Sequence, residues 1–171
     1  MDFKNKVVLI TGASSGIGKQ TAIEFAKLGS NIILVARRKD KLEQVENELK
    51  QFNVTTLICP CDVSKKDQVE IMSKTVLEKF NFVDILVNNA GFAIYGSVLD
   101  LSIEEIESQM ETNYFGMIYC TKNFLPLMLK KKSGHVVNVA SVAASFGLPG
   151  IASYCASKFA MLGFSEGLKH E

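Results

Sequence analysis

The chain has 171 residues, of which 47% are hydrophobic and 22% charged, and it carries 19 basic and 18 acidic side chains. This composition is that of a folded globular domain and excludes a disordered or fibrous chain. The formal net charge of +1 provides no field that would by itself attract nucleic acid or anionic lipid, so the expected partner is a small molecule.

The first apolar run is too short for the core of a signal peptide, because Thr11 and Gly12 follow directly after Val7–Ile10. Nowhere does the chain reach the ~18 consecutive apolar residues that a membrane-spanning helix needs. The four cysteines, at positions 59, 61, 120 and 155, are too sparse for a secreted disulfide scaffold and have no grouped metal ligands beside them. We therefore expect a cytoplasmic protein with reduced, structural thiols and no metal.

Short β-branched runs alternate with longer amphipathic stretches along the whole chain. The runs predict five strands, at Val7–Ile10, Ile32–Val35, Val54–Ile58, Ile85–Val87 and Val136–Val139. The stretches between them predict six helices, with a kink at Pro126 in the fifth, at Gly16–Leu28, Lys39–Phe52, Ser64–Lys79, Ser102–Asn113, Tyr114–Lys131 and Ala152–Lys169. Apolar strands joined by helical crossovers belong to a parallel sheet covered on both faces. The predicted fold class is α/β, a doubly wound parallel sheet in three layers, α/β/α.

Residues 1–171 are expected to form one domain, because no repeat, low-complexity tract or Pro/Gly/Ser linker divides them. The last predicted helix runs into the end of the chain with no strand after it, which leaves the apolar fifth strand at an edge of the sheet. Folds usually cover such an edge. We therefore expect the domain to be incomplete at its C-terminus.

A glycine-rich turn follows the first predicted strand and opens the first helix, reading Thr11-Gly12-Ala13-Ser14-Ser15-Gly16-Ile17-Gly18. Gly12 permits a tight turn, Gly16 lets the backbone approach a pyrophosphate, and Gly18 lets the helix pack against the sheet. The helix N-terminus adds free N–H groups and a positive dipole. A glycine turn without a ligand is the alternative, but the position after the first strand favours a dinucleotide site of the Rossmann type, comprising Gly12, Ser14, Ser15, Gly16, Ile17 and Gly18.

The spacing Gly-x3-Gly-x-Gly after Thr11 resembles the cofactor motif of short-chain dehydrogenases/reductases. Further motifs match this family in order and spacing, namely Asn88-Asn89-Ala90-Gly91, Asn113, Ser141 and Tyr154-Cys155-Ala156-Ser157-Lys158. The resemblance covers residues 6–171 and implies a nicotinamide-dependent oxidoreductase. It also implies that the segment of Asn88, Asn89, Ala90 and Gly91 lines the nucleotide site, and that such proteins normally continue into further C-terminal elements.

Two arginines follow the second predicted strand, where NAD-selective sites carry an acidic residue. Because Arg37 and Arg38 come directly after Ala36, no carboxylate repels a 2′-phosphate, and guanidinium groups are available to bind it. NADP(H) is therefore favoured over NAD(H), with a basic pair that merely caps a surface loop as the alternative. The resemblance implies that Arg37 binds the 2′-phosphate, that Asp62 binds the adenine, and that Val63 lies beside the ring.

Tyr154 and Lys158 are four residues apart, which places them on one face of a helix. A tyrosine with a reference pKa of ~10 is a poor base at neutral pH, and a cation within about 4–6 Å makes a phenol easier to ionise. Lys158 is therefore expected to make Tyr154 a usable general acid and base. The resemblance assigns Ser141 a hydrogen bond to the reacting oxygen, Lys158 a contact with the nicotinamide ribose, and Asn113 a water in the proton path.

The loops after the fourth and fifth strands are apolar and contain no lysine or arginine that could bind a carboxylate or phosphate. They predict a neutral or hydrophobic ketone or secondary alcohol as substrate, in contact with Phe92, Ala93, Ile94, Tyr95, Phe146, Leu148 and Ile151. Two alternatives stay open. One is a nucleotide-sugar epimerase or dehydratase of related fold, for which the glycine spacing is the wrong signature, and the other is a non-catalytic cofactor-binding domain.

The fifth and sixth helices carry more apolar residues than one face of a sheet requires. These residues are Met117, Ile118, Phe124, Leu125, Met128, Leu129, Phe159, Leu162, Phe164 and Leu168. Similar proteins pair these two helices across a two-fold axis, which implies a homodimer or homotetramer. The alternative is that missing C-terminal elements cover the same residues.

Overall fold

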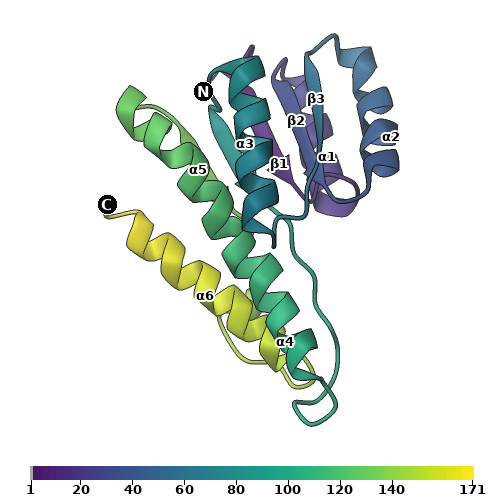
Figure 1. Cartoon of the computed structure of the whole chain (residues 1–171), viewed down its shortest axis with the longest axis vertical. Helices are drawn as coiled ribbons and strands as arrows, with labels where there is room; N and C mark the ends of the chain where they lie inside the picture. The colour runs from purple at the N-terminus through teal and green to yellow at the C-terminus, as the bar shows by residue number, and fades with distance from the viewer. Residues whose placement is uncertain (1) are drawn as a thin grey trace.

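The structure is a computed structural model that describes residues 2–171. Its centre is a five-stranded, fully parallel sheet with the strand order β3-β2-β1-β4-β5 (Figure 1). The strands are β1 (Val7–Thr11), β2 (Asn31–Ala36), β3 (Thr56–Pro60), β4 (Ile85–Asn88) and β5 (His135–Asn138). The order turns at the β1–β4 boundary, because the chain builds outward from β1 to β3 and then returns to the other side of β1.

Helices connect all of these strands and follow the last one. They are α1 (Gly16–Lys27), α2 (Lys39–Leu49), α3 (Lys66–Phe80), α4 (Ile103–Met110), α5 (Gly116–Lys131) and α6 (Ala152–Leu168). Short 3₁₀ turns span Lys50–Phe52 and Val142–Ala144. In Figure 1, α4 and the neighbouring ends of α5 and α6 extend beyond the sheet.

Two hydrophobic cores lie on the two faces of the sheet, because successive strand residues point to opposite sides. On one face, Leu9 and Ile33 share a core with Met72 of α3 and Phe124 of α5. On the other face, the cluster is formed by strand residues and by residues of α1 and α2, including Val8, Ile10, Ile32, Leu34, Ala22, Ala26, Leu42 and Val45. The predicted three-layer, doubly wound architecture is confirmed.

The predicted break between the fourth and fifth helices is wrong. A π-helical turn, Glu111–Phe115, joins α4 directly to α5. Asn113 lies inside this turn and therefore does not end a helix. Its side chain is fully buried and hydrogen-bonded to residues of two other segments. Pro126 lies within α5, which continues to Lys131.

The other corrections concern element boundaries. The third strand begins at Thr56 rather than at Val54, and the third helix begins at Lys66 rather than at Ser64. The fifth strand is shifted by one residue toward the N-terminus. An apolar run marks the centre of a strand, but pairing with the neighbouring strand decides where the strand ends.

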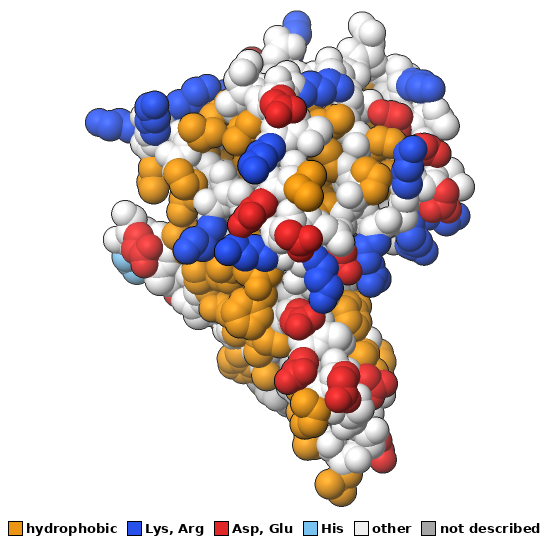
Figure 2. All heavy atoms as spheres, viewed as in Figure 1, with side chains coloured by type: hydrophobic (Ala, Val, Ile, Leu, Met, Phe, Trp, Pro, Cys, Tyr) orange, Lys and Arg blue, Asp and Glu red, His pale blue; other side chains and the backbone are white. Residues whose placement is uncertain are grey.

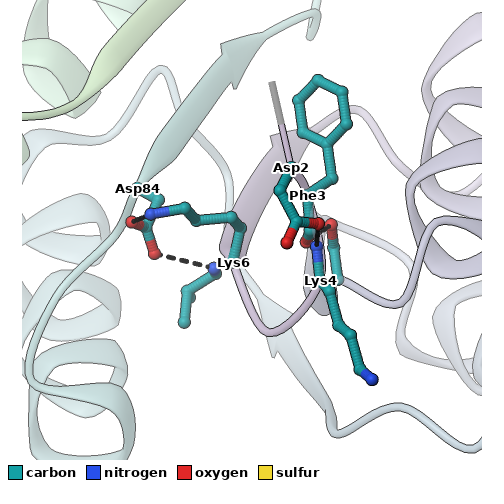
Figure 3. Close-up of polar contacts among 7 residues, drawn as sticks. Asp2, Phe3, Lys4, Lys6 and Asp84 are labelled. Atoms are coloured by element: carbon teal, nitrogen blue, oxygen red, sulfur yellow. Dashed lines mark hydrogen bonds and ion pairs between the residues drawn. The ribbon is translucent and has the colours of Figure 1, made fainter.

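A polar clamp aligns β1 with β4 at the start of both strands (Figure 3). One carboxylate oxygen of Asp84 accepts a hydrogen bond from the Lys6 amine at 2.9 Å, and the other accepts one from the backbone N–H of Val7 at 2.9 Å. The register that follows pairs Val8 with Ile85 and Ile10 with Val87. The clamp thereby brings the loops after β1 and β4 to the same level at the opposite end of the strands.

β5 is an edge strand whose residues are only partly buried, and Val137 is 45% exposed. Within residues 2–171, none of the helices is both long and apolar enough to cross a membrane.

Candidate active site

The candidate site lies at the carboxyl ends of β1 and β4, where the strand order turns. In open α/β sheets this boundary forms a crevice, because the connections that follow the two strands leave the sheet in opposite directions. The turn after β1 supplies Gly12 and Gly16, and the segment after β4 supplies Asn89 and Gly91. Both sequence motifs therefore meet in space.

The glycines of the first turn are required by its geometry. Gly12 and Gly16 have φ values of +67° and +54°, in the left-handed region that side chains disfavour. A Cβ on Gly18 would stand 2.4 Å from the carbonyl oxygen of Gly12, so only glycine lets α1 begin this close to the turn. The predicted packing role of Gly18 agrees with this contact.

Asn89 and Thr11 hold the two loops together. The Asn89 amide nitrogen Nδ2 donates to the carbonyl oxygen of Thr11 at 2.9 Å. In return, the hydroxyl oxygen of Thr11 accepts hydrogen bonds from the backbone N–H groups of Asn89 and Ala90, each at 3.0 Å. These contacts hold the glycine-rich turn after β1 against the segment after β4.

A cleft of about 640 Å³ opens above these loops. Most of the predicted cofactor residues line it together: Gly12, Ser14, Ser15, Gly16, Ile17, Arg37, Arg38, Asp62, Val63, Asn89, Ala90, Gly91, Tyr154 and Lys158. Their segments come from the ends of β1, β2, β3 and β4 and from α6. Residues from five distant parts of the sequence thus share one cavity.

Several lining residues were not predicted as cofactor ligands: Ala36, Cys61, Phe92, Ala93, Thr112, Val139 and Ala140. Most are direct sequence neighbours of predicted residues and carry no distinctive side chain. Their position next to a motif was therefore the only sequence feature that could have predicted them as lining residues. Phe92 and Ala93 belong to the expected apolar wall.

Arg37 and Arg38 are exposed and follow the carboxyl end of β2, immediately before α2. In the segment after the neighbouring strand β3, one carboxylate oxygen of Asp62 accepts hydrogen bonds from the backbone N–H and the hydroxyl of Ser64, at 3.0 and 2.9 Å. These bonds orient the Asp62 side chain at the cleft wall. Cys61 lies beside it, and burial raises the pKa of this thiol to about 12, which keeps it protonated.

Tyr154 and Lys158 lie one turn apart on α6, and the Lys158 amine is 5.8 Å from the centre of the Tyr154 ring. The Lys158 amine donates to the carbonyl oxygen of Val139 at 2.9 Å, and Lys158 is only 4% exposed. Desolvation in this buried position lowers the pKa of Lys158 to about 8. The half-buried Tyr154 side chain faces the same cleft.

Asn113 lies one layer behind the cleft rather than in its wall. Its side-chain oxygen accepts from the backbone N–H of Phe92, and its amide donates to the Phe92 carbonyl and to the Ser157 hydroxyl, all at 2.9 Å. A Cβ on Gly91 would stand 3.0 Å from this amide oxygen and 3.5 Å from the Lys158 amine. Asn113 therefore supports the wall that Lys158 lines.

Ser141 and Asn88 are also absent from the cleft wall. The Ser141 hydroxyl accepts a hydrogen bond from the backbone N–H of Ala143 and caps the 3₁₀ turn that follows. Asn88 is buried, where its amide donates to the Thr121 hydroxyl at 3.2 Å and to the Asn138 side chain at 2.9 Å. The placement of Asn88 on the nucleotide side is therefore wrong, and Asn89 occupies that position.

Comparison with known proteins identifies relatives along the whole chain. The family model described as short chain dehydrogenase matches residues 6–171. A dehydrogenase/reductase SDR family protein 7-like protein of Anopheles gambiae is 40% identical over 171 residues. The alignment covers 97% of this chain and 54% of that protein, so the chain spans about half of its relative's length.

Two solved structures have the same architecture. NAD⁺-bound xylitol dehydrogenase superposes with a TM-score of 0.94 at 30% identity, over 98% of this chain and 65% of the other. A metagenomic short-chain oxidoreductase in complex with NADP also gives a TM-score of 0.94 at 30% identity, over 98% of this chain and 76% of the other. One of these proteins holds NAD⁺ and the other NADP.

Proposed function

Because the chain belongs to the short-chain dehydrogenase/reductase family of oxidoreductases, we propose that it transfers a hydride between NADP(H) and a neutral or hydrophobic ketone or secondary alcohol. The observation that carries this proposal is the shared cleft. It is lined by the glycine-rich turn after β1, by Arg37, and by the pair of Tyr154 and Lys158. A nucleotide bound to the turn therefore shares a cavity with a proton-transfer group.

The cleft fits an extended nucleotide with two phosphate groups. Gly16 has a positive φ, and apart from its chain neighbours and the nearby backbone of its own helix, no described atom lies within 4 Å of the position that its Cβ would take, so its backbone is open to the cleft. The first turn of α1 has no acidic residue, which leaves its N–H groups and the positive end of its dipole available to a phosphate. Ser14 and Ser15 add hydroxyl groups at the same place.

Arg37 and Arg38 favour NADP(H) over NAD(H). The solved relatives include proteins with either nucleotide, so the fold does not decide between them. Arg37 stands in the cleft wall at the position where an acidic side chain would bind a free ribose hydroxyl. A guanidinium there offers planar, charge-assisted hydrogen bonds to a 2′-phosphate.

When bound in this cleft, a nicotinamide would supply or accept the hydride. Tyr154 donates a proton to the carbonyl oxygen during reduction and takes it from the alcohol during oxidation. Lys158, with a pKa of about 8, is mostly protonated at neutral pH and places a positive charge 5.8 Å from the centre of the Tyr154 ring. Ser141 follows Ala140 at the cleft, and its hydroxyl oxygen accepts from the Ala143 N–H, so the hydroxyl proton is available for a second hydrogen bond to the substrate oxygen.

Turnover of NADPH with a panel of apolar ketones tests this function directly. We expect oxidation of NADPH that depends on the added ketone, and faster turnover with NADPH than with NADH. Nucleotide binding without turnover of any ketone or alcohol in the panel would instead favour a non-catalytic binding domain.

We also propose that α5 and α6 mediate self-association. Hydrophobic side chains form a band over these two helices (Figure 2). The exposed hydrophobic residues here include Phe115, directly before α5, and Leu129, Phe159 and Leu162 of the two helices, with exposed fractions from 38% to 61%. A two-fold axis would bury the same patch on both subunits, which is the usual arrangement in a homodimer.

A further inference from the structure

Gln109 is a fully buried polar residue that connects the two segments on either side of the cleft. Its side-chain oxygen accepts a hydrogen bond from the backbone N–H of Ile94 at 3.0 Å. Its amide nitrogen donates to the hydroxyl of Ser153 at 3.1 Å and to the carbonyl oxygen of Glu105 at 3.2 Å. Ile94 lies in the loop after β4, and Ser153 lies in the first turn of α6, immediately before Tyr154.

Gln109 repeats the connection that Asn113 makes one helical turn further along. Asn113 binds the backbone of Phe92 and the hydroxyl of Ser157, whereas Gln109 binds Ile94 and Ser153. The two amides are four residues apart, the two serines are four residues apart, and the two loop residues are two apart along extended chain. The same three segments are therefore joined at two levels.

The two serines bracket the proton-transfer pair. Ser153 precedes Tyr154, and Ser157 precedes Lys158, so each amide fixes the neighbour of one reacting side chain. The Ser157 hydroxyl also donates to the carbonyl oxygen of Tyr154 at 2.7 Å. Gln109 thus supports the first turn of α6 through Ser153, and Asn113 supports the second turn through Ser157.

Packing alone does not explain a glutamine at this position. A buried amide is costly unless its hydrogen bonds are made, and an apolar side chain of the same length would fill the space without that requirement. The amide adds two specific hydrogen bonds, because Gln109 accepts one from the Ile94 N–H and donates one to the Ser153 hydroxyl. These bonds fix how the two segments lie relative to each other. A second contact, from the Gly96 N–H to the Gly150 carbonyl at 2.9 Å, joins the loop after β4 to the segment just before α6, outside the cleft wall.

We propose that Gln109 is a positioning residue that sets the spacing between the loop after β4 and the first turn of α6, and thereby the placement of the Tyr154 hydroxyl against the substrate. The inference rests on the proposed oxidoreductase function. Small displacements of a reacting group reduce turnover strongly, because proton transfer requires hydrogen-bond distance at the moment of reaction. Gln109 does not line the nucleotide cleft, so its loss acts on turnover rather than on nucleotide affinity.

The test compares Gln109→Met, which keeps the side-chain length and removes the amide, with Ser153→Ala, which removes one partner. For Gln109→Met we expect kcat to fall about tenfold while the Kd for NADPH changes less than about twofold. Ser153→Ala should lower kcat in the same direction by about threefold. The double variant should resemble Gln109→Met alone, because both changes break the same connection.

Asn123→Leu is the matched control. Asn123 is a half-buried amide of α5 that accepts a hydrogen bond from Ser73 at 2.9 Å, away from the cleft. Its loss should lower stability without changing kcat.

The possible results separate the two proposals. Unchanged kcat in Gln109→Met, in protein whose unmodified form is active, would overturn the role of Gln109 and leave the oxidoreductase function standing. An equal fall in kcat for Asn123→Leu would also overturn it, since a general loss of stability would then explain the effect. Absence of turnover in the unmodified protein would overturn both proposals. If Gln109→Met does not fold, an unchanged kcat in Ser153→Ala overturns the role of Gln109.

Discussion

The Lys158 amine and the Tyr154 ring centre lie 5.8 Å apart on one face of α6. Lys158 is held there by the carbonyl oxygen of Val139, at the end of β5, so the pair is anchored to the sheet and not only to its own helix. This position buries the Lys158 amine, and the burial makes the free energy of unfolding depend on pH.

The buried amine of Lys158 predicts a specific pH dependence of unfolding. Its pKa is about 8 in the folded protein and 10.5 for the free side chain, so the unfolded chain holds this proton more tightly. Between these two values the unfolded state binds more protons, and the free energy of unfolding therefore rises with pH through that window. Below pH 8 the amine is protonated in both states and contributes no slope.

The measurement compares the unmodified protein with Lys158→Met by denaturant unfolding at pH 7.5 and at pH 10.5. Other titrating groups cancel in the difference between the two proteins. We expect the unmodified protein to gain about 3 kcal/mol relative to the variant across this range. A difference that does not change with pH would show that the Lys158 amine is well solvated in the folded state.

The choice of nucleotide is predicted to depend on Arg37. Arg37→Asp removes a donor to the 2′-phosphate and adds a charge that repels it. Because charge-assisted hydrogen bonds contribute about 1.5–3 kcal/mol, the Kd for NADPH should rise about 10- to 100-fold. The Kd for NADH should change much less, and titration of both nucleotides measures the two effects. Equal affinity of the unmodified protein for both nucleotides contradicts the assignment.

Gly116 is predicted to set the shape of the adenine side of the cleft. A Cβ on Gly116 would stand 2.8 Å from a methyl carbon of Val63, which lines the cleft. Gly116→Ala should therefore push Val63 toward the nucleotide and weaken NADPH and NADH by the same factor, about fivefold. Val63→Ala in the same protein should restore part of the affinity, because it removes the methyl carbon that lies closest, while the Val63 Cβ and carbonyl oxygen stay 3.2 Å from the added Cβ. Unequal effects on the two nucleotides would count against this contact as the cause.

Self-association is predicted to depend on the α5 and α6 surface. Phe159 is 43% exposed, and a charge at this position would be desolvated in an interface between copies. Light scattering at micromolar concentration should give a dimer or larger assembly for the unmodified protein and a monomer for Phe159→Glu. Asp100→Asn, in an exposed turn before α4 that belongs to neither helix, serves as the control. A monomeric unmodified protein removes the proposal.

Sequence patterns predicted the cleft well because its residues follow strands. In a parallel sheet, every segment after a strand emerges at the same edge, so Gly12, Arg37, Asp62 and Asn89 had to converge once the strands were identified. Asn88 was misplaced, although its neighbour was placed correctly. The strand alternates its side chains between faces, and the sequence does not show at which residue the loop begins.

Long-range contacts account for the rest of the site. Gln109 carries no motif, and its role depends on Ile94 and Ser153, which are 15 and 44 residues away. The π-helical turn at Asn113 was missed for the same reason, because three hydrogen bonds to other segments favour it over a regular helix end. The low pKa of Lys158 follows from burial that only the folded chain provides.

The most direct test of the proposed chemistry is the kinetics of Tyr154→Phe with NADPH and an apolar ketone, measured beside the Kd for NADPH. The substitution removes one hydroxyl group and leaves the ring in place. We predict that kcat falls by about 10²–10⁴, the usual contribution of a positioned general acid, while the Kd changes less than about twofold. A variant that keeps the unmodified kcat would show that Tyr154 does not transfer the proton.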